Sequence, residues 1–145
     1  MPQASRVDPY DAFNFFVELD GIVSASFSEV TGLDSETDVI EYRTGDMRLA
    51  VKIPGLHRWS KIVLKRGLTK NLDLWNWREQ VIAGKPERRN GSIVLLSADQ
   101  TPILRINFRN GWPCKWEGPT LNAGTSEVAI ETLEIAHEGF DVVGG

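Results

Sequence analysis

The chain has 145 residues, of which 41% are hydrophobic and 25% are charged, and its formal net charge is −4. This length fits one domain with its own core, and the acidic balance disfavours a dedicated nucleic-acid-binding protein, which normally presents a basic face. No apolar run approaches the roughly 20 residues that span a bilayer. The N-terminus lacks the apolar segment of a secretory signal, and the single cysteine, Cys114, excludes an internal disulfide. The composition therefore predicts a soluble protein made in the cytoplasm.

The N-terminal part of the chain predicts an arm followed by a short strand. Residues 1–9 are polar and end in proline, which is typical of a flexible arm, and residues 10–145 are expected to form one domain. From Phe13 to Leu19, apolar residues alternate with polar ones, and this period of two places them on opposite faces of a half-buried strand. Asp20-Gly21 then provides the turn that ends the strand.

A hairpin and a further strand are expected next. Three segments carry the strand pattern, at residues 39–43, 48–53 and 59–66. Thr44-Gly45-Asp46 supplies the turn between the first two segments, and Pro54-Gly55 interrupts the hairpin after it. Because no aromatic residues are interleaved with them, the basic residues along and after the third segment fit an ordinary charged surface: Lys61, Lys65, Arg66 and Lys70.

One helix is expected from about Asn71 to Ala83. Asn71 is suited to cap its first turn, Asp73 lies where the helix dipole favours an acid, and Gly84 with Pro86 ends it. Apolar residues recur along one side at the spacing of helical turns: Leu74, Trp77 and Val81. We expect this stripe to pack on the sheets.

The C-terminal third predicts long strands. A loop at 88–91 precedes a strand at 92–98, whose unbroken apolar run implies burial on both faces. From Pro102 to Glu117 the chain alternates well beyond the usual strand of about 5–6 residues, with a pause only at Asn110-Gly111. The apolar positions share one parity: Leu104, Ile106, Phe108, Trp112, Cys114 and Trp116. A last strand is expected at 127–137. Together the elements predict a mainly β (α+β) fold, an antiparallel β barrel or sandwich with one packed α-helix.

Residues that could do chemistry are few and scattered. His57 and His137 lie far apart in sequence, and neither has metal-ligand spacing to Cys114, so no metal or cofactor site is indicated. Cys114 shares its parity with two tryptophans and is interpreted as a small buried apolar residue rather than a nucleophile. Four acidic residues fall on two opposite faces of the last strand, which fits a solvated surface better than catalytic carboxylates: Glu127, Glu131, Glu134 and Glu138. With no nucleotide-binding or nucleophile-elbow motif, an enzyme is not expected and no catalytic residue is assigned.

Several sequence blocks, taken in order, resemble one protein family. They lie at residues 13–21 (FNFFVELDG), 27–33 (FSEVTGL), 42–45 (YRTG), 54–56 (PGL), 64–67 (LKRG), 110–119 (NGWPCKWEGP) and 131–139 (ETLEIAHEG). Together these blocks are similar to the tail tube proteins of contractile-tailed phages and of phage-tail-like contractile injection systems. The resemblance runs from about Tyr10 to Gly139, with no block missing and no large insertion.

The resemblance implies a fold and a function. Members of this family form a β barrel with a flanking helix, associate into hexameric rings and stack the rings into a hollow tube inside a contractile sheath. Sheath contraction drives the tube through the target envelope, and cargo, either a protein effector or DNA, passes along the lumen. The implied partners are further copies of the chain, the sheath protein, a baseplate or tube initiator, a terminator or tape-measure protein, and the cargo. The implied location is a phage tail or an extracellular phage-tail-like particle, assembled from protein made in the bacterial cytoplasm.

The resemblance also assigns roles to parts of the chain. The hairpin region is expected to reach a neighbouring subunit and the adjoining ring through Arg43, Gly45, Asp46, Pro54, Gly55, Leu56 and Trp59. The helix is expected to turn its outer side toward the sheath. Polar strand positions are expected to line the lumen, with Arg105, Asn107, Arg109 and Glu134 as candidates. Which parity faces the channel stays open.

Two alternatives to a tube subunit remain. A ring-forming effector carrier, similar to the secreted tube protein of type VI secretion, would form rings that do not stack without a partner. A small enzyme would need a buried polar cluster, which the sequence does not indicate.

Overall fold

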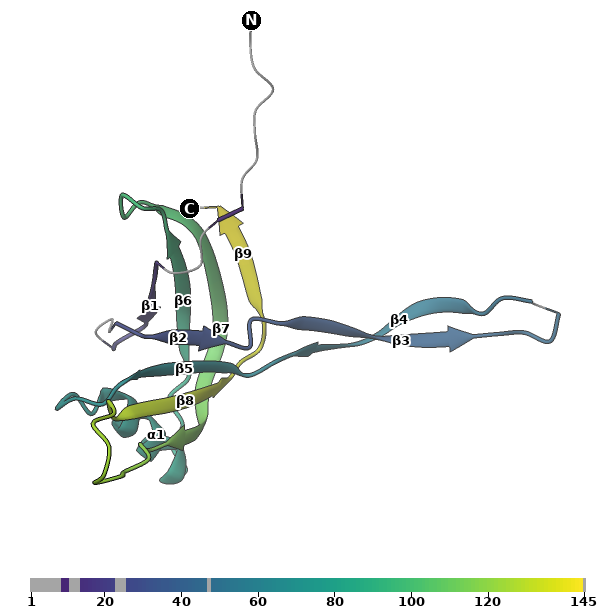
Figure 1. The fold of residues 1–145 in the computed structure, drawn as a ribbon. Coiled ribbons are helices and arrows are strands. Elements are labelled where there is room, and N and C mark those ends of the chain that lie inside the picture. The colour runs from purple at the N-terminus through teal and green to yellow at the C-terminus, as the bar shows by residue number, and fades with distance from the viewer. Residues whose placement is uncertain (1–8, 11–13, 23–25, 47, 145) are drawn as a thin grey trace, which may run out of the picture.

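A computed structural model describes residues 9–10, 14–22, 26–46 and 48–144 of the chain. Phe13 and residues 1–8 of the expected arm lie outside this range. The described residues form nine strands and one helix (Figure 1): β1 (Phe15–Leu19), β2 (Glu29–Thr31), β3 (Ser35–Tyr42), β4 (Val51–Trp59), β5 (Ile62–Gly67), α1 (Asp73–Ile82), β6 (Arg89–Leu96), β7 (Pro102–Glu117), β8 (Ile130–Ala136) and β9 (Phe140–Gly144).

The long strand β7 belongs to two layers of the fold. Its N-terminal half pairs with β6 on one side and β9 on the other, whereas its C-terminal half pairs with β8. The strands therefore form one layer in the order β1-β6-β7-β9 and another in the order β7-β8-β5-β2, and the two layers cross in Figure 1. All of these pairings are antiparallel, and α1 packs against β7. The predicted antiparallel β fold with one packed helix is confirmed.

The predicted pause at Asn110-Gly111 is a bend within one continuous strand. Asn110 adopts a positive φ of 51°, and a Cβ on Gly111 would lie 2.7 Å from the Phe108 ring. Glycine therefore lets the chain turn closely around Phe108 where β7 passes between layers. Beyond the bend the buried positions are Gly111 and Pro113, and the half-buried ones are Trp112, Cys114 and Trp116. The predictions of a single apolar parity along β7 and of a buried Cys114 are therefore wrong.

The four strands of the first layer share one straight register of five rows. Three rows face the core: Phe15·Leu95·Leu104·Gly144, Val17·Ile93·Ile106·Val142 and Leu19·Gly91·Phe108·Phe140. Two rows face away from the core: Phe16·Val94·Arg105·Val143 and Glu18·Ser92·Asn107·Asp141. Because the register does not shift across these rows, each residue of β1 shares a row with one residue of β9, and the two edge strands span the same five rows.

Some boundaries differ from the sequence-based prediction. β6 begins at Arg89, inside the segment predicted as a loop, because pairing with β7 continues to Gly111. β8 is shorter than the predicted strand at 127–137, and β9 was not predicted. Gly139 separates these two strands with a positive φ of 118°, and the chain bends there from one layer into the other while both strands stay antiparallel to β7.

The helix α1 packs as its sequence predicts, but it begins at Asp73, with Leu72 rather than the predicted Asn71 as its N-cap residue. Asn71 Oδ1 accepts a hydrogen bond of 3.1 Å from the Asp73 N–H at the first turn. Leu74 and Trp77 of the predicted stripe are buried, and the Trp77 indole N–H donates to the Glu87 carbonyl at 2.7 Å. The apolar side of α1 therefore forms part of the core.

A buried ion-pair network joins α1, β5 and β8. Arg66 Nε donates to Glu131 Oε2 at 3.1 Å, and Arg66 Nη2 donates to Asp73 Oδ1 at 2.6 Å. Glu131 also accepts a hydrogen bond of 3.1 Å from the Trp116 indole, and Arg66 and Glu131 are only 4% and 2% exposed. Buried charges persist where they are paired in this way. The predictions of a surface Arg66 and a solvated Glu131 are therefore wrong.

Replacing Glu131 with glutamine should destabilise the protein by about 1–3 kcal/mol, because Arg66 then keeps only Asp73 as a charged partner in a buried site. Chemical denaturation measures this loss. Glu117→Gln is the control, since Glu117 pairs with Lys115 at an exposed position where an ion pair contributes little. Equal denaturation midpoints for the two variants would contradict a stabilising role of the network.

Replacing Gly91 with alanine should also destabilise the protein, by about 1–3 kcal/mol. A Cβ at this position would lie 2.8 Å from the Glu18 carbonyl oxygen and would overlap the Phe108 ring, so β1, β6 and β7 would have to separate. Thermal or chemical unfolding tests the effect. Gly45→Ala is the matched control because a Cβ there meets no atom within 4 Å; a similar loss in both variants would refute the steric explanation.

Candidate assembly surfaces

The first layer ends in two strand edges that pair with nothing else in the described part of the chain. β1 pairs only with β6, apart from a single bridge between Leu19 and Ile22, and β9 pairs only with β7. Each edge strand has five residues, and the alternating directions across the layer make β1 and β9 antiparallel to each other. An unpaired edge presents free N–H and C=O groups to a further strand. The two edges are thus complementary in length and direction.

The outward face of this layer is largely polar and internally paired. Arg105 lies 3.5 Å from Glu18, and Arg109 Nη1 donates to Asp141 Oδ2 at 2.7 Å. The Ser92 hydroxyl donates to Asn107 Oδ1 at 2.6 Å. Apolar residues interrupt the face in one row, where Val94 is buried between Phe16 and Arg105 in the register. The face therefore combines balanced charges with a small apolar strip.

Three of the four lumen candidates come together on this face, and the fourth does not. Arg105 and Asn107 occupy the two outward rows of β7, and Arg109 lies at the next outward position along the strand, where it pairs with Asp141. Glu134 lies on β8 in the other layer, where it is 3.4 Å from Lys115 Nζ. Whether this face lines a channel stays a prediction.

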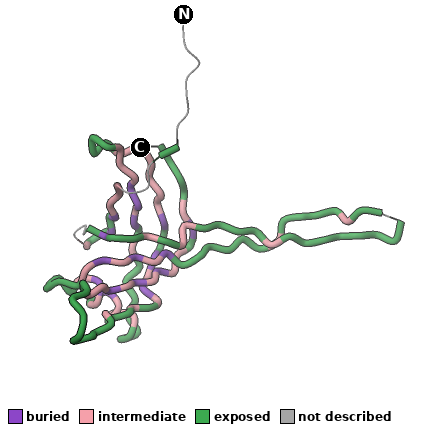
Figure 2. Tube along the Cα trace, in the orientation of Figure 1, coloured by how far each residue is buried: buried purple, intermediate pink, exposed green. Residues whose placement is uncertain are grey.

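The hairpin of β3 and β4 projects far from both layers (Figure 1), and Figure 2 shows it exposed along nearly its whole length. Its two strands contact each other, and in the described residues no other element shares a comparable contact with them. The predicted interruption at Pro54-Gly55 is wrong, since β4 runs through it and the register shifts opposite, between Thr37 and Val39. A Cβ on Gly55 would lie 3.2 Å from Asp38 Cβ, so glycine accommodates this bulge.

The predicted contact residues occupy both ends of the hairpin. Arg43, Gly45 and Asp46 lie at or near the distal turn, and Pro54, Gly55 and Leu56 lie along β4. Trp59 instead lies at the base, where its ring packs edge-on against Phe140 at a centroid distance of 4.9 Å. The set is therefore spread along one projecting element.

The base of the hairpin is held to the body by an aromatic and hydrogen-bonded cluster. His137 lies beside this pair of rings, at centroid distances of 6.2 Å from Trp59 and 6.0 Å from Phe140. The Gly139 N–H donates to His137 Nδ1 at 3.0 Å, which leaves Nε2–H to donate to the Ser60 carbonyl at 2.9 Å. His137 is thus a structural residue at the junction of β4, β8 and β9.

An apolar face of the hairpin was missed at the level of sequence. Ile40 pairs with Ile53 and Tyr42 with Val51, so these four side chains share one face, and each is between 42% and 55% exposed. The alternation of apolar and polar residues in β3 and β4 indicates this face. It does not indicate that no other described part of the chain packs on the face. Nearer the base, the Asp38 carboxylate accepts two hydrogen bonds from Arg58, of 3.0 and 2.9 Å, and the guanidinium holds the pKa of Asp38 below its usual range.

Across residues 9–10, 14–22, 26–46 and 48–144, no group of three or more His, Cys, Asp or Glu side chains is placed to hold a metal ion. Within the same part of the chain, no helix is long and apolar enough to cross a membrane. The distinctive features are instead open edges and a projecting hairpin, which suit contacts with other chains.

The fold is similar to chains of several solved structures. One chain of the PVC sheath–tube complex, an extracellular contractile injection system in its extended state, is 24% identical with a TM-score of 0.87, over 94% of this chain and 93% of that one. One chain of the anti-feeding prophage cap is 23% identical with a TM-score of 0.90, over 99% and 97%. Hcp1 from Flavobacterium johnsoniae is 17% identical with a TM-score of 0.59, over 92% and 97%. At these identities the likeness concerns the fold.

The family comparison extends over nearly the whole sequence. No individual curated protein gives a significant sequence match. The family model described as T4-like virus tail tube protein gp19, however, matches residues 11–141, from ahead of β1 into β9. The chain therefore belongs to the T4-like virus tail tube protein family.

Proposed function

We propose that this tail tube protein is the inner tube subunit of a contractile tail or injection system, in which hexameric rings stack into a hollow tube. The observation that supports the proposal is that β1 and β9, the two edge strands of one four-stranded layer, span the same rows and run antiparallel to each other. Its family consists of structural tube proteins, so catalysis is not its expected role.

Joining β9 of one copy to β1 of the next would continue the antiparallel order without a break. Such a contact uses two different surfaces of each copy. Repeating it produces a closed ring when the rotation that relates neighbouring copies adds up to a full turn. In a closed ring each edge is paired, so the exposed N–H and C=O groups of both edges are satisfied. The equal five-residue lengths of β1 and β9 support this arrangement.

In the proposed ring, the outward face of the first layer lines the lumen. Support comes from its polar character, with Arg105 paired to Glu18 and Arg109 paired to Asp141. Side chains already paired with each other bind passing cargo weakly. A ring of six copies, each with a net charge of −4, would carry −24 in total, a strong overall field.

The proposed partners follow from the projecting hairpin, the helix and the solved relatives. The β3–β4 hairpin would reach a neighbouring subunit and the adjoining ring, and the outer side of α1 would face a sheath protein. The relatives are described as parts of a sheath–tube complex, a baseplate, a tube cap and a sheath/tube terminator, which supports sheath, baseplate initiator and terminator partners here. Protein effector or DNA would be the cargo, and the particle would be a phage tail or an extracellular phage-tail-like assembly built from cytoplasmically made protein.

A ring-forming effector carrier is the second candidate, favoured by the fold likeness to Hcp1. Negative-stain microscopy of the purified chain separates the two functions. Long hollow tubes support the proposal, whereas isolated rings favour the carrier.

Substituting Val142 with lysine should prevent ring closure while leaving the monomer folded. Val142 lies on the edge strand β9 and is 56% exposed in the single chain, and a lysine on a strand edge opposes pairing with a further strand. Sedimentation and negative-stain microscopy measure the loss of rings and tubes.

Val128→Lys is the control, since Val128 is also exposed but lies outside the edge strands. Normal tubes from Val142→Lys, or equal loss in both variants, would contradict the edge-joining arrangement.

Deleting Gly45 to Gly55 should leave folded monomers that do not polymerise, because the deleted part of β4 pairs with β3, whereas the base of the hairpin at Trp59, which packs on Phe140, is kept. Circular dichroism checks the fold, and sedimentation measures assembly. Val128→Lys, at an exposed position outside the hairpin, should assemble normally. Normal tubes from the deletion would exclude the hairpin from polymerisation.

A further inference from the structure

The corner between β8 and β9 is held by the side chain of His137, which makes one hydrogen bond through each ring nitrogen. Nδ1 accepts the Gly139 N–H at 3.0 Å, and Nε2–H donates to the Ser60 carbonyl at 2.9 Å. The first bond caps the positive-φ bend just ahead of β9, and the second joins the ring to the residue that follows β4. One side chain therefore connects the start of β9 to the base of the hairpin.

Only a neutral imidazole makes both of these hydrogen bonds. The imidazolium carries a proton on each nitrogen, so it keeps the bond to Ser60 but has no acceptor for the Gly139 N–H. Gly139 is buried, and a buried backbone N–H without a partner is unfavourable. His137 itself is only half-buried, and histidine side chains change charge between about pH 5 and 8. The bond is therefore present at the upper end of this range and is lost as the pH falls.

The charged groups around the corner do not offset this loss. A Cβ on Gly139 would lie 2.9 Å from Arg109 Nη2, so a guanidinium already lies beside the bend, where it pairs with Asp141. Further charged residues adjoin the segments around the ring: Asp34, Arg58, Lys61 and Glu138. Across the described residues, no carboxylate forms an ion pair with the His137 ring. A proton added to the ring therefore gains no charged partner.

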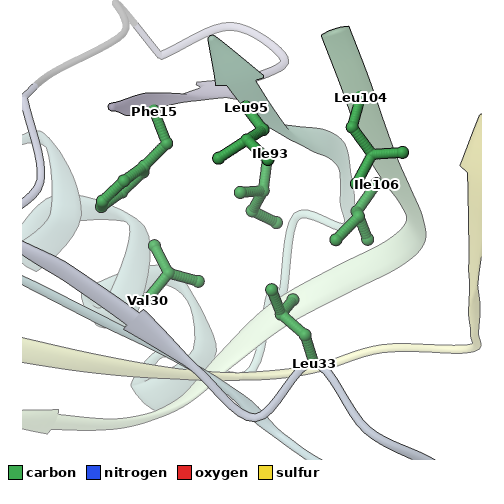
Figure 3. A pocket seen from close by; sticks show the side chains of 7 residues that line it. All are labelled: Phe15, Val30, Leu33, Ile93, Leu95, Leu104 and Ile106. Atoms are coloured by element: carbon green, nitrogen blue, oxygen red, sulfur yellow. The ribbon is translucent and has the colours of Figure 1, made fainter. Parts of the chain in front are cut away.

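The strand that begins at this corner borders an apolar cleft. The cleft has a volume of about 210 Å³ and lies between the first layer and the segment around β2, and Figure 3 shows the apolar side chains that converge on it. Two of them, Leu104 and Ile106, lie on β7 in rows to which β9 contributes Gly144 and Val142. Because β9 pairs with β7 alone, its separation would uncover apolar side chains next to the cleft.

We infer that His137 is a proton-sensitive positioning residue, whose neutral imidazole holds the β9 edge and the base of the hairpin in one arrangement and whose protonation releases β9. Its effect on the single chain depends only on the bond between His137 and Gly139. Its effect on assembly rests on the proposed tube function, in which β9 joins the next copy. Mild acid should therefore weaken both the fold and ring closure through the same side chain.

Two substitutions separate the hydrogen bond from the proton. His137→Asn supplies an amide oxygen that accepts an N–H two residues ahead, as asparagine does in turns, and it does not titrate. His137→Gln places its amide one carbon farther out and leaves this N–H without its acceptor. His57→Asn is the matched control, because His57 is exposed on the hairpin and its ring bonds with the Thr37 hydroxyl.

Thermal unfolding of the dilute, unassembled chain is compared at about pH 7.5 and about pH 5.5, near the two ends of the histidine range. The Tm of the unsubstituted chain and of His57→Asn should fall by several degrees more in acid than the Tm of His137→Asn, and binding of an apolar dye should rise several-fold only in the first two. His137→Gln should have a low Tm at both values. An equal fall in the unsubstituted chain and His137→Asn overturns the inference.

Nitrogen NMR of isotope-labelled histidine gives a readout that a merely structural role would not move, and it needs no substitution. At about pH 7.5, Nδ1 of His137 should be unprotonated and Nε2 protonated; a proton on Nδ1 overturns the inference. In negative-stain microscopy, acid should reduce the number of tubes several-fold for the unsubstituted chain but not for His137→Asn. A chain that forms neither rings nor tubes at either pH would instead refute the proposed function, while unfolding and NMR still decide the role of His137.

Discussion

The sharing of β7 between two layers is the constraint on which the rest of the structure depends. Because its first half pairs with β6 and β9 and its second half with β8, one strand holds both layers at the bend around Asn110-Gly111. The layers enclose a core on one side, but the first layer does not close on itself. Its four strands alternate in direction, so its two edges are antiparallel and able to pair with identical copies.

Taken alone, the chain carries features that are unfavourable in a monomer. Open strand edges recruit other chains, and exposed apolar faces are uncommon unless they mark contact surfaces. The edges of the first layer, the apolar face of the hairpin and the cleft beside Ile106 are three such features. The proposed assembly accounts for all of them together, because it would pair the edges and cover the apolar surfaces.

Charged residues have different roles in different parts of the molecule. The Arg66–Glu131–Asp73 network is buried and fixes the helix to the second layer. The pairs on the outward face of the first layer are partly exposed, so their main effect is to balance charge rather than to stabilise the fold. Asp38 and Arg58 form a similarly exposed ion pair near the base of the hairpin.

Local patterns in the sequence determined the helix, the long alternating strand and the turn of the hairpin, because capping residues and periods of 3.6 and two act over neighbouring residues. The burial of Glu131 could not be predicted locally, since its partner Arg66 is 65 positions away and joins it only when β5 pairs with β8. Pro54 and Gly55 predicted an interruption of the strand, but β4 continues through them because the register shift lies in β3, between Thr37 and Val39. The tertiary structure alone decided which polar residues share the outward face, which edges stay open and where the apolar cleft lies, because each of these depends on strand register between distant segments.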